Sequence, residues 1–279
     1  MANKDFLDKL YSDHIECCKF PSEQKIRLFL NDLLGTLFPE MTDQVFLNRS
    51  RFGLHFANLK ETFYELIYAK PNNEAERVEN NSNIFFDSLP AIYEILLSDA
   101  KAMYDGDPAA ESVEEVMRTY PGFYAIAAYR IANQLFNQNI KVIPRAIAEI
   151  AHTKTGIDIH PGATIASSFC IDHGTGIVIG ATSNIGKNVK IYQGVTLGAL
   201  SVNKADAKIK RHPTLEDNVV VYAGATILGG ETVVGAGSII GGNVWLTRSL
   251  PKKSTVYYKT KMNSDNEDQT DILMHKVAM

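Results

Sequence analysis

The chain has 279 residues, of which 45% are hydrophobic, and its formal net charge is −4 with an isoelectric point near 6.0. This length suits two domains, and the mildly acidic balance argues against nucleic acid or an anionic membrane as a partner. No apolar run approaches the roughly 20 residues that a membrane helix needs. The first residues lack the apolar core of a signal peptide. Three cysteines suit a reducing compartment better than a disulfide scaffold, so we expect a cytoplasmic protein.

Residues 1–155 have the pattern of an all-helical domain. A helix is predicted to begin near Pro21, and its apolar side consists of Ile26, Phe29, Leu30, Leu33, Leu34 and Leu37. Further helices are expected over residues 59–69, 84–100, 123–137 and 143–153. Between them, residues 70–83 are predicted to form a loop and residues 104–109 a short turn.

In residues 156–250 the aliphatic side chains return every six positions. The spacing is met by Ile159, Ile165, Ile171 and Ile177 and, after a two-residue slip, by Ile185, Ile191 and Leu197. It resumes at Ile209 and continues through Leu215, Val221, Ile227, Val233 and Ile239. A helix would repeat near 3.6 residues and an amphipathic strand at 2, so neither explains this period. A period of six is typical of a parallel β-helix, in which stacked short strands direct aliphatic side chains into a shared interior.

These two patterns predict the fold class α+β, with an amino-terminal helical domain over residues 1–155 and a hexapeptide β-helix over residues 156–250. Residues 198–210 do not fit the repeat, and we expect them to protrude as a loop. Residues 251–279 are predicted to form a polar carboxyl-terminal tail, in which residues 263–270 are expected to be mobile.

Three clusters of polar residues interrupt the repeats and are candidates for a functional site. Asp158 and His160 open the β-helix, Asp172 and His173 follow about one coil later, and Arg211 and His212 end the expected loop. Because aliphatic side chains fill the interior of a β-helix, such residues must act on its outer surface or between subunits. They supply a base, carboxylates that can orient it or bind an amine, and a guanidinium suited to a carboxylate.

Six motifs of the chain together resemble those of the serine O-acetyltransferase family, a group of hexapeptide-repeat acyltransferases. They are Asp107–Ala109, Gly122–Ile131, Asp158–Pro161, Asp172–Ile177, Gln193–Gly198 and Arg211–Pro213. The resemblance implies a left-handed β-helix that trimerises through its coils, with helical domains that commonly join two trimers into a hexamer. It also implies the transfer of an acetyl group from acetyl-CoA to the hydroxyl of L-serine, the first committed step of cysteine biosynthesis.

The same resemblance implies a role for each candidate residue. His173 resembles the family's general base and Asp158 the carboxylate that orients it; Asp107 and Asp172 resemble the residues that hold the serine amino group, and Arg211 and His212 those near its carboxylate. Acetyl-CoA is expected as the co-substrate, and no metal is expected. The CoA arm would lie along the flank of the coils, where small residues leave room at Gly198, Ala199, Ala223, Gly224, Gly241 and Gly242.

Two positions depart from the family's pattern. Ala181 stands where relatives commonly have Glu, so the function of that carboxylate is missing here. The last residue is Met279, whereas many relatives end in an Ile that inserts into cysteine synthase. Because Met is unbranched and flexible, it fits such a pocket less well, and we expect no stable complex with cysteine synthase.

Three other functions remain open at the level of sequence. The first is another CoA-dependent hexapeptide acyltransferase, which would act on a sugar, an amine or another alcohol. The second is a metalloenzyme similar to γ-class carbonic anhydrases, with zinc bound by His160, His173 and His212, although the close His-x4-His spacing of such sites is missing. The third is a β-helix scaffold without catalytic activity.

Overall fold

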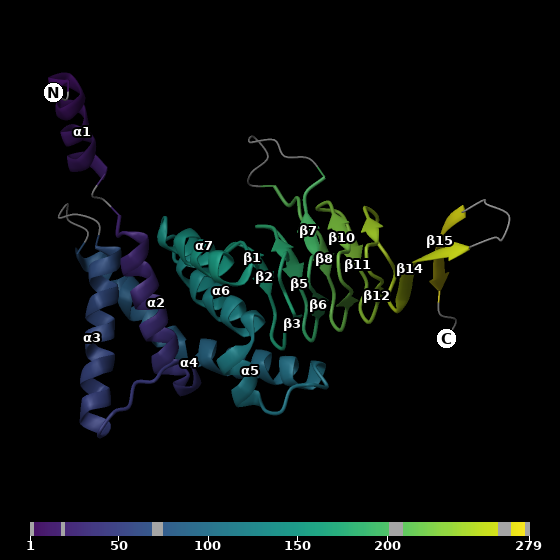
Figure 1. The fold of residues 1–279 in the computed structure, drawn as a ribbon, viewed down its shortest axis with the longest axis horizontal. Helices are drawn as coiled ribbons and strands as arrows, with labels where there is room; N and C mark the ends of the chain where they lie inside the picture. The colour runs from purple at the N-terminus through teal and green to yellow at the C-terminus, as the bar shows by residue number, and fades with distance from the viewer. Residues whose placement is uncertain (1–2, 18–19, 69–74, 201–208, 262–268, 277–279) are drawn as a thin grey trace.

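The chain forms a group of helices that leads into a parallel β-helix (Figure 1). The computed structural model describes residues 3–17, 20–68, 75–200, 209–261 and 269–276. The helices are α1 (Lys4–Cys17), α2 (Glu23–Leu37), η1 (Pro39–Met41), α3 (Arg49–Ile67), α4 (Ala75–Gly106), α5 (Val113–Thr119), α6 (Pro121–Asn137) and α7 (Ile143–Thr155). The fold class predicted from the sequence is confirmed. None of the helices in these ranges combines the length and the apolarity that crossing a bilayer requires.

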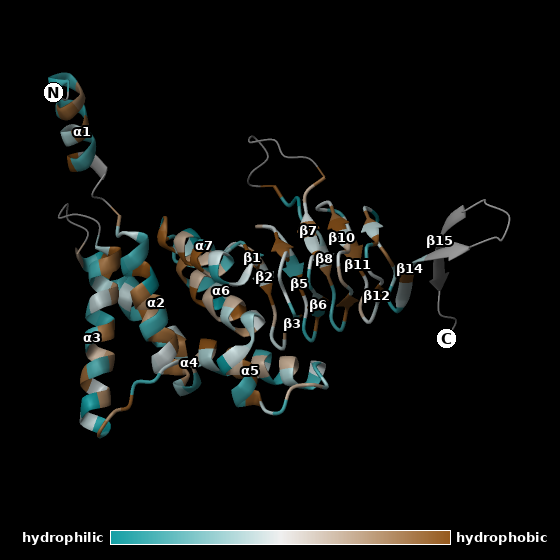
Figure 2. Cartoon of the chain, viewed as in Figure 1, coloured by the Kyte–Doolittle hydropathy of each residue, from teal (hydrophilic) through white to brown (hydrophobic). Residues whose placement is uncertain are grey.

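Helix α2 forms where the apolar spacing predicts a helix. Ser22 caps its amino end by accepting a hydrogen bond from the Lys25 amide at 3.4 Å. Five of its six predicted apolar residues are buried, and Leu37 is partly buried. Along these helices hydrophobic and hydrophilic residues alternate between sides (Figure 2). The helices are therefore amphipathic and share one core, as their spacing requires.

The sequence pattern underestimates the extent of the helices. Helix α3 begins at Arg49, and α4 begins at Ala75, so the expected loop over residues 70–83 is wrong from Ala75 onward. Val78, only 4% exposed, anchors this polar first part of α4 to the core. Helices α1 and α5 have no counterpart among the predicted elements. Helix α5 has seven residues, too few for a clear helical period.

Three parallel sheets form the sides of the β-helix. Sheet A contains β1 (Asp158–Ile159), β4 (Val178–Ile179), β7 (Thr196–Gly198), β10 (Thr226–Leu228) and β13 (Trp245–Leu246). Sheet B contains β2 (Thr164–Ile165), β5 (Asn184–Ile185), β8 (Thr214–Leu215) and β11 (Val233–Val234). Sheet C contains β3 (Cys170–Asp172), β6 (Lys190–Tyr192), β9 (Val220–Val221), β12 (Ile239–Ile240), β14 (Ser254–Lys261) and β15 (Gln269–Lys276).

The chain passes from sheet A to sheet B to sheet C in each coil, so its turns form edges between the sheets. Two of these edges carry the candidate residues. We call edge C–A the turns from sheet C to sheet A, at residues 173–177, 193–195, 222–225 and 241–244. We call edge A–B the connections from sheet A to sheet B, at residues 160–163, 180–183, 199–213 and 229–232.

The two-residue slip lies one repeat earlier than the spacing predicts. Ile179, and not Ile177, is the strand residue that stacks between Ile159 and Leu197. The two extra residues therefore fall in the turn over residues 173–176. Ile177 is also buried, at the inward position two residues before the strand residue. Because both isoleucines are apolar, the spacing alone does not distinguish them.

Three further residues that were predicted to fill the interior of the β-helix do not do so. Ile209 is 61% exposed at the end of the long connection, so it fills no interior position. Val234 and Ile240 are the fully buried residues of their strands, one position after Val233 and Ile239. Each of these strands carries two adjacent aliphatic residues, so either one satisfies the hexapeptide pattern.

Residues 251–279 contain regular strands as well as polar sequence. Strand β14 pairs in parallel with β12 and antiparallel with β15. Val256 lies beside Ile240 and is 3% exposed, so it extends the interior of the β-helix by one more position. Most of the segment expected to be mobile, and the terminal Met279, lie outside the described residues.

Helix α6 attaches the helices to the first coil. Gly122 lies against β3, where a Cβ atom would come within 2.8 Å of the Ile171 carbonyl oxygen, so only glycine permits this approach. Farther along α6, Arg130 Nε donates to Asp99 Oδ2 of α4 at 3.0 Å. The same guanidinium donates to the carbonyl oxygens of Ile165 and Ala166. One buried ion pair thus joins two helices to the β-helix.

Candidate active site

The turn after β3 carries His173 at edge C–A. The φ angle of His173 is +58°, a left-handed conformation that is uncommon for residues other than glycine. Gly174 and Gly176 in the same turn are also left-handed, at +95° and +82°. The His173 side chain is 73% exposed, so its imidazole is accessible to a ligand.

Asp172 lies next to two basic groups. Its Oδ2 atom is 2.8 Å from Lys190 Nζ, and its Oδ1 atom is 3.7 Å from His173 Nε2. The side chains of Asp172 and Lys190 are 13% and 17% exposed. Because little water reaches this ion pair, its electrostatic attraction is stronger than that of a surface pair.

Asp107 brings a second carboxylate to the same edge from the end of α4. Its Oδ1 atom accepts a hydrogen bond from the Ala109 amide at 2.8 Å, and its Oδ2 atom accepts one from the Tyr120 hydroxyl at 2.5 Å. Both hydrogen bonds lower the pKa of Asp107. The bond between Asp107 and Tyr120 also raises the pKa of the Tyr120 hydroxyl to about 12. The charges of Lys190 and His173 also lower the pKa of Asp107. A carboxylate held in its charged form can bind an ammonium group.

A second cluster lies at edge A–B around Thr182. The Thr182 hydroxyl oxygen accepts hydrogen bonds from the backbone amides of Arg211 at 2.9 Å and His212 at 3.1 Å. Lys210 Nζ donates to the carbonyl oxygens of Thr182 at 2.9 Å and His212 at 2.7 Å. Thr182 therefore fixes the end of the long connection to the turn between β4 and β5.

His212 is a buried imidazole, in contrast to His173. Its Nδ1 atom accepts a hydrogen bond from the Thr182 amide at 3.1 Å, which assigns the proton of the neutral ring to Nε2. Burial and the cations of Arg211 and Lys210 lower the pKa of His212 to about 4. The ring packs on Gly180, where a Cβ atom would come within 2.0 Å of His212 Cδ2. His212 is therefore neutral at physiological pH and offers an N–H donor.

The two clusters lie on opposite edges of sheet A within one protomer. His173 precedes β4, whereas Arg211 and His212 follow β7 and precede β8. The structure therefore brings Asp107 and Asp172 together with His173 but leaves the two predicted carboxylate-binding residues on the other side of the sheet.

Asp158 is separate from the base that it was predicted to orient. Its Oδ1 atom is 3.7 Å from Arg145 Nη1 of α7. In the part of the chain that the structure describes, no hydrogen bond or ion pair joins Asp158 to His173. Asp158 lies beside Val178, the first strand residue after the His173 turn. Asp158 and His173 therefore both lie where sheet A meets edge C–A.

Two residues of the His173 cluster, Tyr120 and Lys190, are missing from the sequence candidates. Tyr120 reads as an ordinary residue before a helix, and Lys190 as a solvated residue on the outer side of a strand. The Lys190 contact with α4 spans 84 positions of sequence, so no local pattern indicates it. Only the folded chain identifies these two residues.

Comparisons with known proteins give the family. No family model matches the chain. A serine acetyltransferase, plasmid, of Synechococcus elongatus is 43% identical over 269 residues, which cover 88% of this chain and 84% of that relative. The chain belongs to the serine acetyltransferase family.

Solved structures agree with this assignment. Serine acetyltransferase 1 of Entamoeba histolytica in complex with L-cysteine superposes with a TM-score of 0.74 at 36% identity, over 82% of this chain and 85% of that one. A serine acetyltransferase in complex with CoA has a TM-score of 0.57 at 29% identity, over 84% and 94% of the two chains.

The six residues expected along CoA divide between two edges. Gly198 ends β7 and Ala199 follows it at edge A–B, whereas Ala223, Gly224, Gly241 and Gly242 lie at edge C–A. Along edge C–A, the left-handed glycines Gly176, Gly194 and Gly224 stack on one another. This column begins in the His173 turn, and its three residues carry no side chain.

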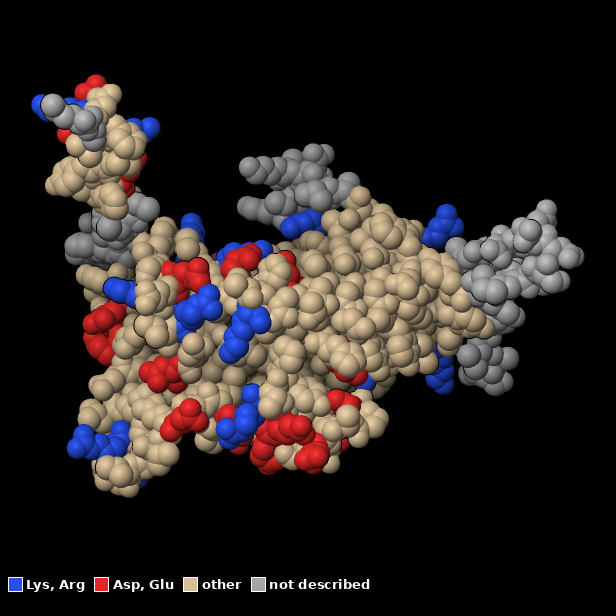
Figure 3. All heavy atoms as spheres, in the orientation of Figure 1, with Lys and Arg blue, Asp and Glu red and all other residues tan. Residues whose placement is uncertain are grey.

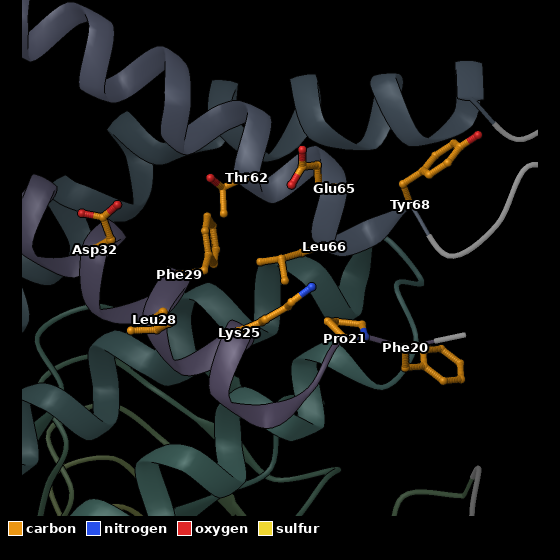
Figure 4. Close-up of a pocket in the computed structure, with 10 residues that line it drawn as sticks. All are labelled: Phe20, Pro21, Lys25, Leu28, Phe29, Asp32, Thr62, Glu65, Leu66 and Tyr68. Atoms are coloured by element: carbon orange, nitrogen blue, oxygen red, sulfur yellow. The ribbon is translucent and has the colours of Figure 1, made fainter. Parts of the chain in front are cut away.

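A pocket of about 450 Å³ lies away from both clusters, between α2 and α3 (Figure 4). Phe29 and Leu66 form its apolar wall, and Lys25, Asp32 and Glu65 contribute charges. It is lined by no residue of either cluster, so we place no chemistry of the acetyltransferase there. Among the described residues of one protomer, no three His, Cys, Asp or Glu side chains are grouped as a metal site requires.

Proposed function

We propose that this chain transfers the acetyl group of acetyl-CoA to the hydroxyl of L-serine and releases O-acetyl-L-serine and CoA, a step of cysteine biosynthesis. The observation that carries the proposal is the cluster at edge C–A, in which the exposed His173 imidazole lies beside two carboxylates. The carboxylates suit the ammonium of an amino acid, and the imidazole suits the proton of its hydroxyl. The family of the chain supports the same reaction.

His173 acts as the general base. A serine hydroxyl is a poor nucleophile at neutral pH, and a neutral imidazole accepts its proton while the oxygen attacks the thioester carbonyl. The new carbon–oxygen bond forms, the carbon–sulfur bond breaks, and the imidazolium returns the proton to the departing thiolate. A carboxylate paired with the imidazole orients it and stabilises the imidazolium. Asp158, which begins sheet A beside Val178 and the His173 turn, is our candidate for that role in the substrate complex.

Transfer is direct, within a complex that holds both substrates. A covalent route would need a nucleophile near His173, and the cysteine nearby in sequence is Cys170. Cys170 is 5% exposed, and burial raises the pKa of its thiol to about 12. A buried, protonated thiol is a weak nucleophile and packs as a small apolar side chain.

The serine carboxylate is bound by Arg211 and His212 of a neighbouring copy in a trimer. One amino acid is too small to contact both edges of sheet A, so a protomer alone offers only half of the required groups. In a trimer, edge A–B of one copy meets edge C–A of the next. The divided set of CoA residues supports the same arrangement, because two of the six lie at edge A–B and four at edge C–A.

The outer surface of sheet A suits such an association. Apart from Asp158 in the first strand, its outward residues Val178, Thr196, Thr226 and Trp245 are uncharged, and Trp245 is 62% exposed. Figure 3 shows few charged side chains on the visible face of the β-helix, whereas acidic side chains gather over α5. A largely uncharged surface with an exposed tryptophan favours burial against another copy. We also propose that the trimer works in the cytoplasm.

The experiment is an assay of CoA thiol release from acetyl-CoA with a panel of amino acids, amines and sugars. The proposal expects release with L-serine and a product that carries one acetyl group on oxygen, identified by mass spectrometry. Release with a sugar or an amine, and none with L-serine, would instead assign the chain to another acyl acceptor.

A further inference from the structure

Lys190 is a partly buried cation at the centre of the His173 cluster. Its Nζ atom is 2.8 Å from Asp172 Oδ2 and donates a hydrogen bond to the Gly106 carbonyl oxygen at 2.6 Å. The Tyr192 ring centroid lies 4.5 Å from Nζ. Burial alone would lower the pKa of Lys190, but its contacts with Asp172 and Tyr192 raise this pKa above the usual value. The side chain is therefore charged at any pH at which the protein works.

These contacts connect the helices to the β-helix at the site. Gly106 is the last residue of α4 and directly precedes Asp107, whereas Lys190 lies on β6. Because one ammonium holds both the Gly106 carbonyl and Asp172, it fixes the carboxylate of Asp107 relative to that of Asp172. The cation also reduces the repulsion between the two carboxylates.

Asp172 has two possible partners, and Lys190 selects between them. The Oδ2 atom is within hydrogen-bond distance of Lys190, but the 3.7 Å between Oδ1 and His173 Nε2 is longer than a hydrogen bond. Without Lys190, the carboxylate is free to turn towards the imidazole. A carboxylate paired with the imidazole would favour its protonated form, which cannot accept a proton from the substrate.

We propose that Lys190 is a positioning residue that holds Asp172 ready for the substrate ammonium and keeps it off the His173 imidazole. This inference rests on the proposed function and describes how the same site separates its base from its ammonium-binding carboxylate. The other titratable groups of the same protomer near the imidazole are Asp158 at the start of β1, and Asp107 after α4 and Tyr120 before α6, which are bonded to each other, with Glu115 of α5 beside Tyr120. In the proposed trimer, Arg211 and His212 of the neighbouring copy also face this site.

Replacement of Lys190 by Met tests the proposal. The KM for L-serine is expected to rise about tenfold or more, since a hydrogen bond to a charged group is lost, while the KM for acetyl-CoA stays within about twofold. The acidic limb of the pH profile of kcat/KM is expected to move to higher pH, because the freed carboxylate pairs with the imidazole. Lys190→Arg keeps a cation and should restore most of both properties.

The matched control is Lys101→Met, which removes a lysine paired with Asp105 on the exposed side of α4. It should leave both KM values and the pH profile unchanged. Thermal unfolding of each variant reports the structural contribution separately. If Lys190→Met does not fold, Lys190→Gln, which retains a donor for Gly106 without the charge, takes its place in the same measurements.

Two results would overturn the proposal. Equal changes in the two KM values with an unmoved acidic limb would reduce Lys190 to a structural residue. A lower KM for L-serine in the uncharged variant would show that the lysine cation repels the substrate ammonium. The wild-type chain is assayed in parallel, so its inactivity with L-serine would refute the proposed function, a result distinct from either of these.

Discussion

Two histidines of this chain acquire opposite properties from their immediate surroundings. His173 stands in a turn that contains two residues more than a regular repeat, and its left-handed backbone leaves the ring exposed. His212 packs on a glycine, accepts a hydrogen bond from Thr182 and lies beside two cations. The first is accessible to take up a proton, while the second is held neutral as a donor. The backbone and the neighbouring charges, and not the residue type, make this difference.

Replacement of His212 by Asn should change how stability depends on pH. The folded-state pKa of about 4 for His212 lies below the usual value of about 6.5, so between these values the unfolded chain binds more protons than the folded chain. The free energy of unfolding of the wild type therefore falls as the pH decreases through this window. Urea unfolding across the window should show a flatter slope for His212→Asn, and the wild-type slope for the exposed control His14→Asn. An unchanged slope in His212→Asn would contradict the assignment.

Among the secondary-structure elements, helix α6 joins the β-helix through a glycine and a buried arginine. Gly122 permits its first turn to touch β3, and Arg130 on a later turn bonds to the connection between β2 and β3. Asp99 completes the set by accepting bonds from Arg130 and from the Phe169 amide. These contacts fix the helices against the coil that carries His173, so the site depends on a junction between two parts of the chain.

Removal of the buried carboxylate of this junction should destabilise the protein strongly. Burial raises the pKa of Asp99 to about 6, against the lowering effect of Arg130, so the pair is charged at a pH well above 6. Asp99→Asn leaves the Arg130 charge buried without its partner, which typically costs about 3–5 kcal/mol. Denaturant unfolding at such a pH measures the loss. The exposed ion pair between Lys101 and Asp105 offers a control, since Asp105→Asn should lower the free energy of unfolding by no more than about 1 kcal/mol. Equal costs for the two variants would contradict the role of the junction.

The elements that repeat could be predicted from sequence, and those that join distant segments could not. The β-helix follows from its period, because each coil places one aliphatic residue against the next. The register was ambiguous wherever two aliphatic residues are adjacent, as at Val233 and Val234. The His173 cluster was predicted in part, since its carboxylates occur in recognisable motifs. Lys190 and Tyr120 join it through contacts across the fold, which no local pattern encodes.

At the scale of the whole molecule, the division of the candidate residues between two edges points to an assembly. His173 and Arg211 occupy opposite edges of sheet A. In the trimer that we propose, one protomer supplies the base and a neighbour supplies the guanidinium. This arrangement would make the trimer a requirement for activity rather than a source of stability alone. It also allows the number of intact sites in a trimer of mixed variants to be counted, because each site takes His173 from one protomer and Arg211 from the next.

Mixed trimers of two inactive variants should regain activity. His173→Ala removes the base and Arg211→Ala removes the carboxylate contact, so each variant alone should be nearly inactive at subsaturating L-serine. Each mixed trimer has one intact site of three, so unfolding and refolding an equal mixture should yield about a quarter of the wild-type rate. A mixture without refolding serves as the control. No recovery after refolding would place both residues in the site of one protomer.

The central claim is that the His173 imidazole accepts the proton of L-serine while acetyl-CoA is bound. The most direct measurement is kcat for CoA release by the wild type and by His173→Ala, with both substrates saturating and folding checked by thermal unfolding. A positioned general base contributes about 10²–10⁴-fold, so kcat should fall by that factor while the unfolding temperature is retained. A His173→Ala variant that folds normally and turns over L-serine at close to the wild-type rate would contradict the account.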